Sequence, residues 1–442
     1  MKYVCKYTPI ELLAGFDIEV ELLNPTAENY ESSDQYIHSN VCSYSRSIIE
    51  ARLRDGSDPI IFTSCCDSME RTADVLKNLG QKVYLLNLPH HNNCCAKLLY
   101  KKELLKLIDA LSQTLNRKFD VEKFYSSFAP NSDDISGPYV AVMGARVNSD
   151  LLELIKKESP LPIKNNTCTG NRSVAKPHQT DDCEELMAWY ADALLSQIPC
   201  MRMSDIAKRR DLTEDPNLCG IIYNTVNFCD FYTFEYSKLK STLKVPILKI
   251  ETDYTLLATE QIKTRLGAFY ENLVAKQEKN QRKSSTAHTY YAGIDIGSTS
   301  TNVVIIDDQK NVISFAIVPT GVKVAVSAQK ALAEALNKAG LEFEELNKIV
   351  TTGYGRARID FRTKDVTEIT CHAKAAYFLN PKVRTVIDIG GQDSKVIRLD
   401  AKGNVTDFVM NDKCAAGTGR FLEMMAQSLQ LSLEEMSTYG LK

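Results

Sequence analysis

Cysteine is the residue type in this chain most able to do chemistry. The 442 residues include 13 cysteines, eleven of them before residue 230. Two adjacent pairs, Cys65-Cys66 and Cys94-Cys95, lie among these eleven, and no C-x-x-C spacing occurs. The lack of C-x-x-C argues against a zinc ribbon and against a bacterial ferredoxin run. In a reducing compartment, so many dispersed thiols predict metal or redox chemistry rather than a disulfide framework.

The overall composition is that of a globular protein. Hydrophobic residues make up 44% of the chain and charged residues 25%, and the formal net charge is -3. This charge gives no reason to expect nucleic acid or an anionic membrane as a partner. The first residues, MKYVCKYTPIELL, have no apolar signal-peptide core, and no apolar run has the length needed to cross a bilayer. We therefore expect a cytoplasmic protein with no nucleic-acid or membrane partner.

An internal repeat near the end of the chain is the second chemical feature. Residues 293–306 read GIDIGSTSTNVVII and residues 386–397 read VIDIGGQDSKVI, and each is followed by a polar turn and another apolar run. Each copy predicts a hairpin whose first strand carries Asp-Ile-Gly, at Asp295 and at Asp388. One copy alone would suit an ordinary hairpin turn. Two copies that face each other predict a site that grips nucleotide phosphates from both sides.

The residue types in these hairpins suit that role. Glycine lets backbone amides approach phosphate oxygens, hydroxyls donate hydrogen bonds, and a strand-end aspartate can hold Mg²⁺ through water. No G-x-x-x-x-G-K-[ST] occurs, so the chain is not a P-loop enzyme. The predicted phosphate site consists of Asp295, Gly297, Ser298, Thr299, Ser300, Asp388, Gly390, Gly391, Gln392, Gly417, Thr418 and Gly419.

Cys414 lies in the segment MNDKCAAGTGRFLEMMAQSL, just ahead of a predicted helix. The positive end of a helix dipole lowers the pKa of a thiol and stabilises an anionic thiolate–metal cluster. The alternative is a buried and inert cysteine, which is the commoner fate of a lone one. The glycine-rich, polar surroundings favour the cluster ligand.

The elements that must position these groups follow an α/β pattern. Apolar runs at 59–62 and 83–86 alternate with helical patterns, which predicts largely parallel sheets. Residues 276–289, which begin KQEKNQRKSSTAH, are polar and predict a linker. We predict α/β lobes at 1–138 and 139–275, the linker at 276–289, and a further domain with the hairpin repeat at 290–442.

Five motifs after the linker resemble the activator ATPases of 2-hydroxyacyl-CoA dehydratases, a group that includes the benzoyl-CoA reductase ATPase subunits. In chain order they are GIDIGSTSTNVV, TTGYGR, EITCHAKAA, VIDIGGQDSK and MNDKCAAGTGRFL. The resemblance implies an actin/sugar-kinase/Hsp70-like lobe that hydrolyses ATP with Mg²⁺ at Asp295 and Asp388. It also implies a homodimer that shares one [4Fe–4S] cluster, with Cys414 as a ligand and Cys371 as a structural residue. In this family, the second cluster cysteine and the adenosine-binding segment would lie beyond Lys442, so we expect an incomplete activator domain.

The segments before the linker resemble the catalytic components of 2-hydroxyacyl-CoA dehydratases. They are YIHSNVCSYSR, PIIFTSCCDSMERTADVL, VYLLNLPHH, NTVNFCDFYTFE and PILKIETDYTLLATEQIKTRLGAFYE. In that family dispersed cysteines hold a cluster between α/β lobes, which implies Cys42, one of Cys65-Cys66, and Cys229 as ligands of a [4Fe–4S] cluster. The extra cysteines resemble double-cubane relatives, in which six cysteines hold an [8Fe–9S] cluster. That set would be Cys42, Cys65, Cys66, Cys94, Cys95 and Cys229, with Cys219 as a substitute.

The other cysteines before the linker are predicted to be inert thiols: Cys5, Cys168, Cys183 and Cys200. His90 and His91 are predicted to be solvated loop residues. His372 follows Cys371 directly, and neighbours in a helix rarely face each other, so no role is assigned to it.

These features predict ATP-dependent, low-potential electron transfer through iron–sulfur clusters that drives radical dehydration or reduction. The resemblance implies a ferredoxin or flavodoxin as electron donor and a CoA thioester as substrate. A small-molecule kinase is one alternative, but it leaves the eleven cysteines before residue 230 without a role. A zinc-binding regulator without catalytic activity is the other.

Overall fold

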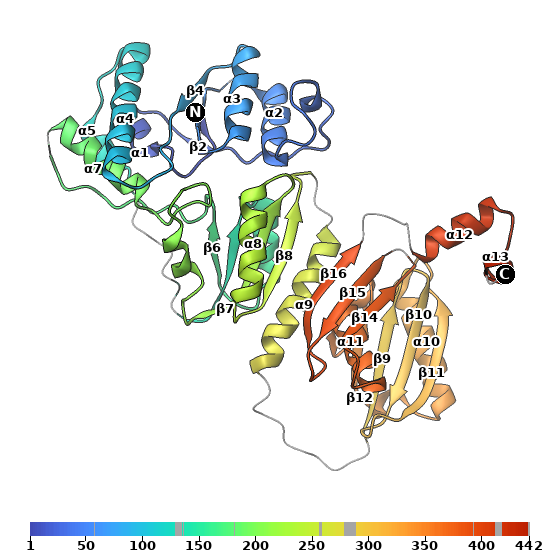
Figure 1. Ribbon diagram of the computed structural model, residues 1–442. Coiled ribbons are helices and arrows are strands. Elements are labelled where there is room, and N and C mark those ends of the chain that lie inside the picture. Colours follow the sequence, from blue (N-terminus) through green and yellow to red (C-terminus); the bar gives the residue numbers. More distant parts are fainter. Residues whose placement is uncertain are drawn as a thin grey trace. The chain divides into compact units, whose positions relative to one another are not determined.

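A computed structural model describes residues 1–56, 58–128, 135, 137–180, 182–255, 259–277, 289–391, 393–411 and 418–440. The chain forms two compact units, Met1–Thr259 and Glu260–Lys442 (Figure 1). Most of the predicted linker lies outside the described residues, as do Gln392, Cys414 and Gly417. Among the described helices, none is both long enough and apolar enough to span a bilayer.

Two four-stranded parallel sheets form the framework of the first unit. One has the order β2-β1-β3-β4, from β1 (Lys2–Tyr3), β2 (Glu21–Leu22), β3 (Ile60–Thr63) and β4 (Val83–Leu86). The other has the order β6-β5-β7-β8, from β5 (Tyr139–Gly144), β6 (Ile163–Thr167), β7 (Leu218–Val226) and β8 (Ile247–Thr252). The prediction of α/β structure with parallel sheets is confirmed.

The two sheets share one topology. In each, the first strand lies between the second and the third, so the chain changes direction across the sheet between β1 and β3 and between β5 and β7. Open α/β sheets bind ligands outside the carboxyl ends of their strands at such a switch point. The first unit therefore has two places suited to a ligand.

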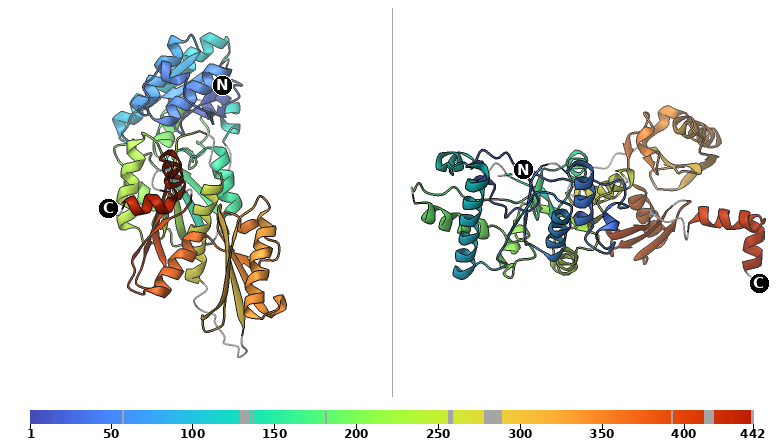
Figure 2. Two further views of the ribbon diagram at one scale, coloured as in Figure 1. Left: turned by 90° about the vertical axis from the view of Figure 1, so that its right-hand side faces the viewer. Right: turned by 90° about the horizontal axis from the view of Figure 1, so that it is seen from above.

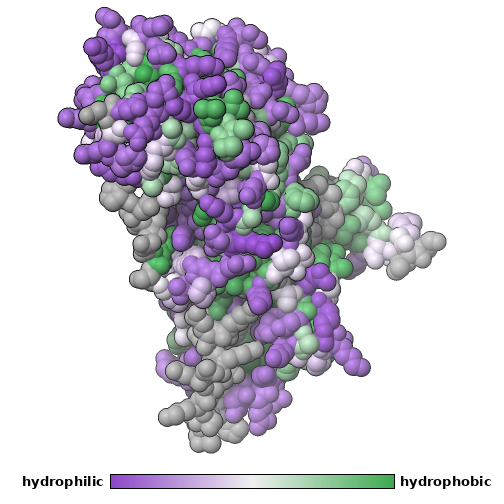
Figure 3. Space-filling model, turned by 60° about the vertical axis from the view of Figure 1, so that its left-hand side comes forward, coloured by the Kyte–Doolittle hydropathy of each residue, from purple (hydrophilic) through white to green (hydrophobic). Residues whose placement is uncertain are grey.

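Helices connect these strands and cover the sheets. They are α1 (Ile10–Ala14), α2 (Ser43–Asp55), α3 (Asp67–Asn78), α4 (Cys94–Leu115), α5 (Val121–Ser126), α6 (Ser149–Glu158), α7 (Cys183–Leu195) and α8 (Asp230–Thr242), with 3₁₀ turns at Ser33–Gln35 and Ala207–Leu212. Every residue of β3 and β5 is buried, as expected for parallel strands covered on both faces. Hydrophilic side chains predominate on the face of this unit seen in Figure 3.

A mixed sheet and a meander form the second unit. The mixed sheet has the order β11-β10-β9-β12-β13, from β9 (Tyr290–Ile296), β10 (Ser300–Ile306), β11 (Val312–Pro319), β12 (Leu346–Thr352) and β13 (Lys364–Asp365). The antiparallel meander consists of β14 (Thr385–Ile389), β15 (Ser394–Leu399) and β16 (Val405–Asn411). The helices are α9 (Thr259–Gln277), α10 (Val324–Ala339), α11 (Glu368–Leu379), α12 (Gly419–Ser428) and α13 (Leu433–Gly440), with 3₁₀ turns at Phe343–Glu345 and Arg356–Arg358. Helix α10 lies along β9, β10 and β11 (Figure 2).

The two copies of the sequence repeat fold alike. β9-β10-β11 and β14-β15-β16 are both antiparallel meanders. In the first turn of each, the glycine N–H donates to a carbonyl three residues on, from Gly297 to Ser300 at 3.0 Å and from Gly390 to Asp393 at 2.8 Å. In the second turn of each meander, an aspartate carboxylate accepts hydrogen bonds from an asparagine four residues on. The pairs are Asp307-Asn311 and Asp400-Asn404. The predicted strand–turn–strand repeat is thus confirmed down to its hydrogen bonds.

Helix α9 belongs by its contacts to the second unit, whereas the sequence predicts it at the end of the second lobe. Ala268 shares an apolar cluster with Ile369 and Ala373 of α11. The Glu271 carboxylate accepts hydrogen bonds from the Thr367 N–H and hydroxyl, both at 2.8 Å. Packing and capping of α11 therefore join α9 to the second compact unit, Glu260–Lys442.

Candidate functional site

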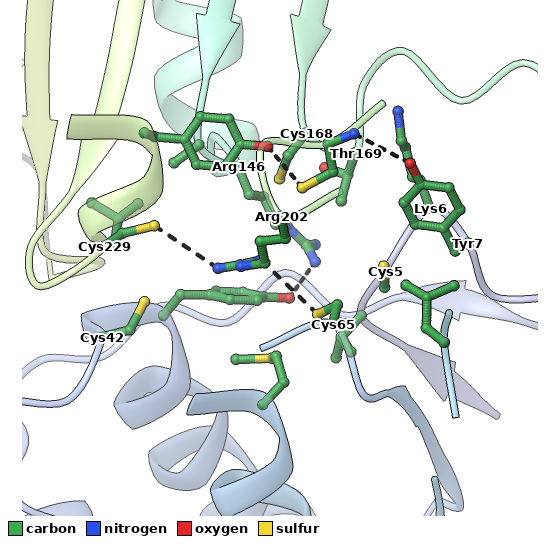
Figure 4. A pocket seen from close by; sticks show the side chains of 18 of the residues that line it. Cys5, Lys6, Tyr7, Cys42, Cys65, Arg146, Cys168, Thr169, Arg202 and Cys229 are labelled. Carbon is green, nitrogen blue, oxygen red and sulfur yellow. Dashed lines mark hydrogen bonds between the residues drawn. The ribbon is translucent and has the colours of Figure 1, made fainter. Parts of the chain in front are cut away.

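Six cysteines line a single cavity in the first unit (Figure 4). Four of them follow strands directly or closely, after β1, β3, β6 and β7, and two lie in the segments before α2 and after α7. The cavity also contains residues that follow β5, so both switch points open onto it. The six are Cys5, Cys42, Cys65, Cys168, Cys200 and Cys229.

Within the cavity, four of the thiols influence one another in pairs. The Cys229 side chain lowers the pKa of the Cys42 thiol, and Cys42 in turn raises the pKa of Cys229. A hydrogen bond with Cys65 likewise lowers the pKa of Cys5. Figure 4 shows the first pair on one side of the cavity and the second on the other. The cavity thus has two pairs of thiols, and the chain segments that carry them belong to both sheets of the first unit.

Three cysteines in or beside this cavity lie at the N-terminal ends of helices. Cys42, Cys66 and Cys229 are the N-cap residues of α2, α3 and α8, and none of their side chains makes a capping hydrogen bond. Ser, Thr, Asp and Asn are the residues that usually satisfy this position. The N-terminal end of a helix stabilises negative charge, and the pKa of Cys42 is lowered. The neighbouring thiols Cys65 and Cys42, together with burial, instead raise the pKa of Cys66 and of Cys229.

The charged groups around the cavity are all cationic. Lys6, Arg146 and Arg202 line it, and no aspartate or glutamate lines it among the residues that the structure describes. Burial lowers the pKa of Lys6 to about 8. The guanidinium nitrogens of Arg202 lie 3.9 Å from the Cys65 sulfur and 3.9 Å from the Cys229 sulfur. Soft thiol donors among unpaired cations fit an anionic iron–sulfur group.

The residues of the second unit that are predicted to bind phosphate also come together. A Cβ atom placed on Gly391 would lie 3.3 Å from the Thr299 hydroxyl and 3.8 Å from the Ser298 hydroxyl. The first turns of the two hairpins therefore face each other. Helix α12 begins at the same place, because the Gly419 N–H donates to the Gly390 carbonyl at 3.1 Å.

Each aspartate of the repeat pairs with a residue on the opposite strand of its hairpin. Asp295 lies opposite Asn302, and Asp388 lies opposite Lys395. The Lys395 ammonium is 3.5 Å from the Asp388 carboxylate, and its side chain is only 5% exposed. Burial raises the pKa of Asp295, so the two carboxylates are not electrostatically equivalent.

His372 of α11 holds the second carboxylate in place. Its Nδ1 lies 2.9 Å from Oδ2 of Asp388. This hydrogen bond lowers the pKa of Asp388 and raises the pKa of His372. Asp388 is therefore ionised and oriented, which suits a carboxylate that binds hydrated Mg²⁺.

Comparison with known proteins places this chain in a family. Residues 5–130 and 130–273, more than half of the chain, match the family model described as 2-hydroxyglutaryl-CoA dehydratase, D-component. The chain belongs to this dehydratase D-component family. Residues 292–439 match the BadF/BadG/BcrA/BcrD ATPase family. Both predicted resemblances are confirmed.

The relatives found for this dehydratase-family chain match its ATPase part. The activator of lactoyl-CoA dehydratase from Anaerotignum propionicum is 50% identical over 148 residues, which cover 34% of this chain and 57% of that protein. The (R)-2-hydroxyglutaryl-CoA dehydratase activating ATPase from Acidaminococcus fermentans is 42% identical over 154 residues, which cover 35% and 58%. The crystal structure of component A of the Acidaminococcus fermentans enzyme is 41% identical, covers 35% of this chain and 59% of that chain, and gives a TM-score of 0.33. The chain thus spans somewhat more than half the length of these relatives.

The structure of this dehydratase-family chain gathers a different set of cysteines from the predicted six. Cys94 and Cys95 are exposed in the first turn of α4, with their sulfurs 4.0 Å apart, and they do not line the cavity. Helix α4 starts at Cys94, well beyond the end of β4 at Leu86, and both cysteines are exposed in its first turn. Cys5, Cys168 and Cys200, predicted to be inert, line the cavity instead.

The remaining predicted residues of the dehydratase-family chain fall as follows. Cys66 adjoins Cys65 just outside the lining, and Cys219 lies within β7, where it contacts the Asn217 carbonyl at 3.6 Å. His90, predicted to be solvated, lines the cavity, and its Nε2 is 3.0 Å from the Ser64 carbonyl. Sequence reasoning assigned no role to His372 and did not single out Lys395. The sequence repeat could have identified Lys395, because Lys395 occupies the position in the second hairpin that Asn302 occupies in the first.

Gly353, in the TTGYGR motif, supports Asp295, and its replacement by alanine is expected to be costly. Its φ is +81°, and a Cβ would lie 2.4 Å from Oδ1 of Asp295 and 2.6 Å from the Ile296 carbonyl. Strain and displacement of this loop should together destabilise the second unit by about 2–3 kcal/mol, as measured by urea unfolding. Gly340 is the matched control, because its φ is +68° but nothing lies within 4 Å of its Cβ position. Gly340→Ala should cost only about 1 kcal/mol, and equal costs for the two variants would contradict the role of the Asp295 contact.

Proposed function

We propose that this protein carries out ATP-dependent, low-potential electron transfer, with an iron–sulfur group in the cysteine-lined cavity and Mg²⁺·ATP at the paired hairpins. The observation that carries the proposal is the cavity itself, where six thiols and three cations meet without a carboxylate among the lining residues. The electrons would serve radical dehydration or reduction of a small substrate, with a CoA thioester as the substrate class.

The donor set favours a cluster over a single metal ion. Thiolates bind zinc, copper(I) and iron–sulfur clusters, and a structural zinc ion takes four ligands. Six cysteines exceed that number. Among the described residues, no group of three or more His, Cys, Asp or Glu side chains is placed to hold one ion. In a cluster each cysteine binds a different iron, so thiols spread around a cavity suit it.

Six cavity cysteines match the ligand count of a double-cubane [8Fe–9S] cluster, and a single [4Fe–4S] cluster would use four or fewer of them. The residues that would hold the larger group are Cys5, Cys42, Cys65, Cys168, Cys200 and Cys229. When bound, such a group supplies single electrons at low potential to a substrate. The protein's own contribution would be ligation, exclusion of water, and hydrogen bonds to sulfur.

ATP would act through the contact between the phosphate turn and α12. The Gly419 N–H at the start of α12 bonds to Gly390 in the turn of the second hairpin. Rearrangement of that turn between ATP-bound and ADP-bound states would therefore move the segment that follows Cys414, a residue that we propose as a ligand of a second, interface cluster. A difference in affinity between the two conformers makes electron delivery directional. We also propose a homodimer and a ferredoxin or flavodoxin donor.

The coupling of ATP hydrolysis to electron transfer tests this proposal. Under anaerobic conditions, reduced ferredoxin should be oxidised in the presence of Mg²⁺·ATP and not with Mg²⁺·ADP, and ATP hydrolysis should accompany each electron transferred. Phosphorylation of a small molecule without electron transfer would instead indicate a kinase. Zinc binding with no electron transfer would indicate a regulator. Phosphorylation alone or zinc binding alone would each contradict the proposal.

A further inference from the structure

Arg202 differs from three other arginines of the first unit. These pair with carboxylates at 2.6 Å, in the pairs Arg46–Asp34, Arg172–Glu11 and Arg209–Glu235. Arg202 has no such carboxylate among the described residues, and its Nε is buried without a hydrogen-bond partner. A buried guanidinium N–H without a hydrogen-bond partner is costly, so the position of the Arg202 Nε favours an anionic acceptor beside it.

The position of Arg202 identifies what that partner would be. Its two terminal nitrogens lie 3.9 Å from the sulfurs of Cys65 and Cys229, which follow strands of different sheets. Figure 4 shows the guanidinium between these two cysteines, inside the ring of thiols. The Phe231 ring, with its centroid 5.4 Å from Cζ, packs on the guanidinium and holds it in this place. The terminal N–H groups of Arg202 therefore lie near sulfur atoms on both sides of the cavity.

We propose that Arg202 is a positioning residue that donates hydrogen bonds to the sulfur atoms of the iron–sulfur group and raises its reduction potential. The inference rests on the proposed function, because it requires a cluster in this cavity. Reduction by one electron adds one negative charge to the group. A fixed positive charge and N–H donors stabilise the more negative, reduced form, and hydrogen bonds to sulfur are an established control on cluster potential.

Arg202→Gln tests the proposal, with Arg202→Lys as the conservative variant and Arg210→Gln as the control. Arg210 is exposed and lies in the same connecting segment. We expect Arg202→Gln to retain iron and acid-labile sulfide. Its equilibrium constant for one-electron reduction should fall about tenfold, which is about 59 mV in midpoint potential. An EPR-monitored redox titration measures this shift. Arg202→Lys keeps the charge and should shift the potential less, and Arg210→Gln should leave it unchanged.

Two results would overturn the proposal. One is an unchanged potential in Arg202→Gln at full iron content, because Arg202 would then have no influence on the group. The other is equal loss of iron and of thermal stability in Arg202→Gln and Arg202→Lys, which would mean that Arg202 only supports the fold. A wild-type protein without iron or sulfide would instead refute the proposed function on which this inference depends.

Discussion

Replacing Cys229 by serine is expected to remove at least half of the iron bound by the protein. The Cys229 sulfur lines the cavity, interacts with Cys42 and lies 3.9 Å from a guanidinium nitrogen of Arg202, so it belongs to the proposed ligand set. Serine is nearly the same size, so the change tests the sulfur rather than the packing. Loss of one thiolate ligand should release the iron that it holds, because protein thiolates are what retain such clusters. Iron and acid-labile sulfide per chain, measured on anaerobically purified protein, check this.

The double variant Cys94→Ser/Cys95→Ser is the matched control for that loss. These cysteines are exposed at the start of α4 and do not line the cavity, so iron content should not change. Cys168→Ser and Cys200→Ser should behave like Cys229→Ser, because both thiols line the cavity. Full iron in Cys229→Ser together with iron loss in the Cys94/Cys95 variant would contradict the ligand set.

Replacing either aspartate of the hairpin repeat is expected to lower ATP hydrolysis at least about 100-fold, because a metal ion supplies several kcal/mol of transition-state stabilisation to phosphoryl transfer. Asp295 and Asp388 occupy matching positions in hairpins whose turns face each other. Asparagine keeps the shape and removes the charge that attracts hydrated Mg²⁺. Asp295→Asn and Asp388→Asn, assayed for Mg²⁺-dependent ATP hydrolysis in the full-length protein, test this.

Asp307→Asn is the control for this pair. Asp307 lies in the same first hairpin meander but in its second turn, where it is half-buried and accepts hydrogen bonds from the Gln309 and Asn311 N–H groups. Its replacement should weaken that turn slightly and leave ATP hydrolysis within about twofold of the wild type. A loss as large in Asp307→Asn as in Asp388→Asn would mean that the hairpins are sensitive to any change, and it would remove the argument for a metal site.

The hairpin repeat was the part most open to prediction. Its hydrogen bonds are local, from Gly297 to Ser300 and from Gly390 to Asp393, so a short sequence contains everything that determines the turns. The parallel sheets were predictable for a similar reason, because β3 and β5 are continuous apolar runs. His372 was not predictable, since its contact with Asp388 depends on how α11 packs against the meander.

The cavity was only partly predictable. Cys42, Cys65 and Cys229 lie in segments that resemble the dehydratase family, whereas Cys5, Cys168 and Cys200 do not. What unites the six is the shared topology of the two sheets, which brings strand ends from distant parts of the chain to one cavity. The adjacent pair Cys94-Cys95 had the more conspicuous sequence pattern, but adjacency in a chain does not determine which way a helix presents its first turn. The long-range topology of the two sheets, which no local sequence pattern contains, determines which cysteines line the cavity.

The metal content of the anaerobically purified wild-type protein tests the central claim most directly. Iron, acid-labile sulfide and zinc per chain should be measured together, with an EPR spectrum after reduction. We predict about eight irons with matching sulfide for a double-cubane cluster in the six-cysteine cavity, and about four would indicate one ordinary cubane there. Zinc without sulfide, or no metal at all, would contradict iron–sulfur electron transfer as the function of this protein.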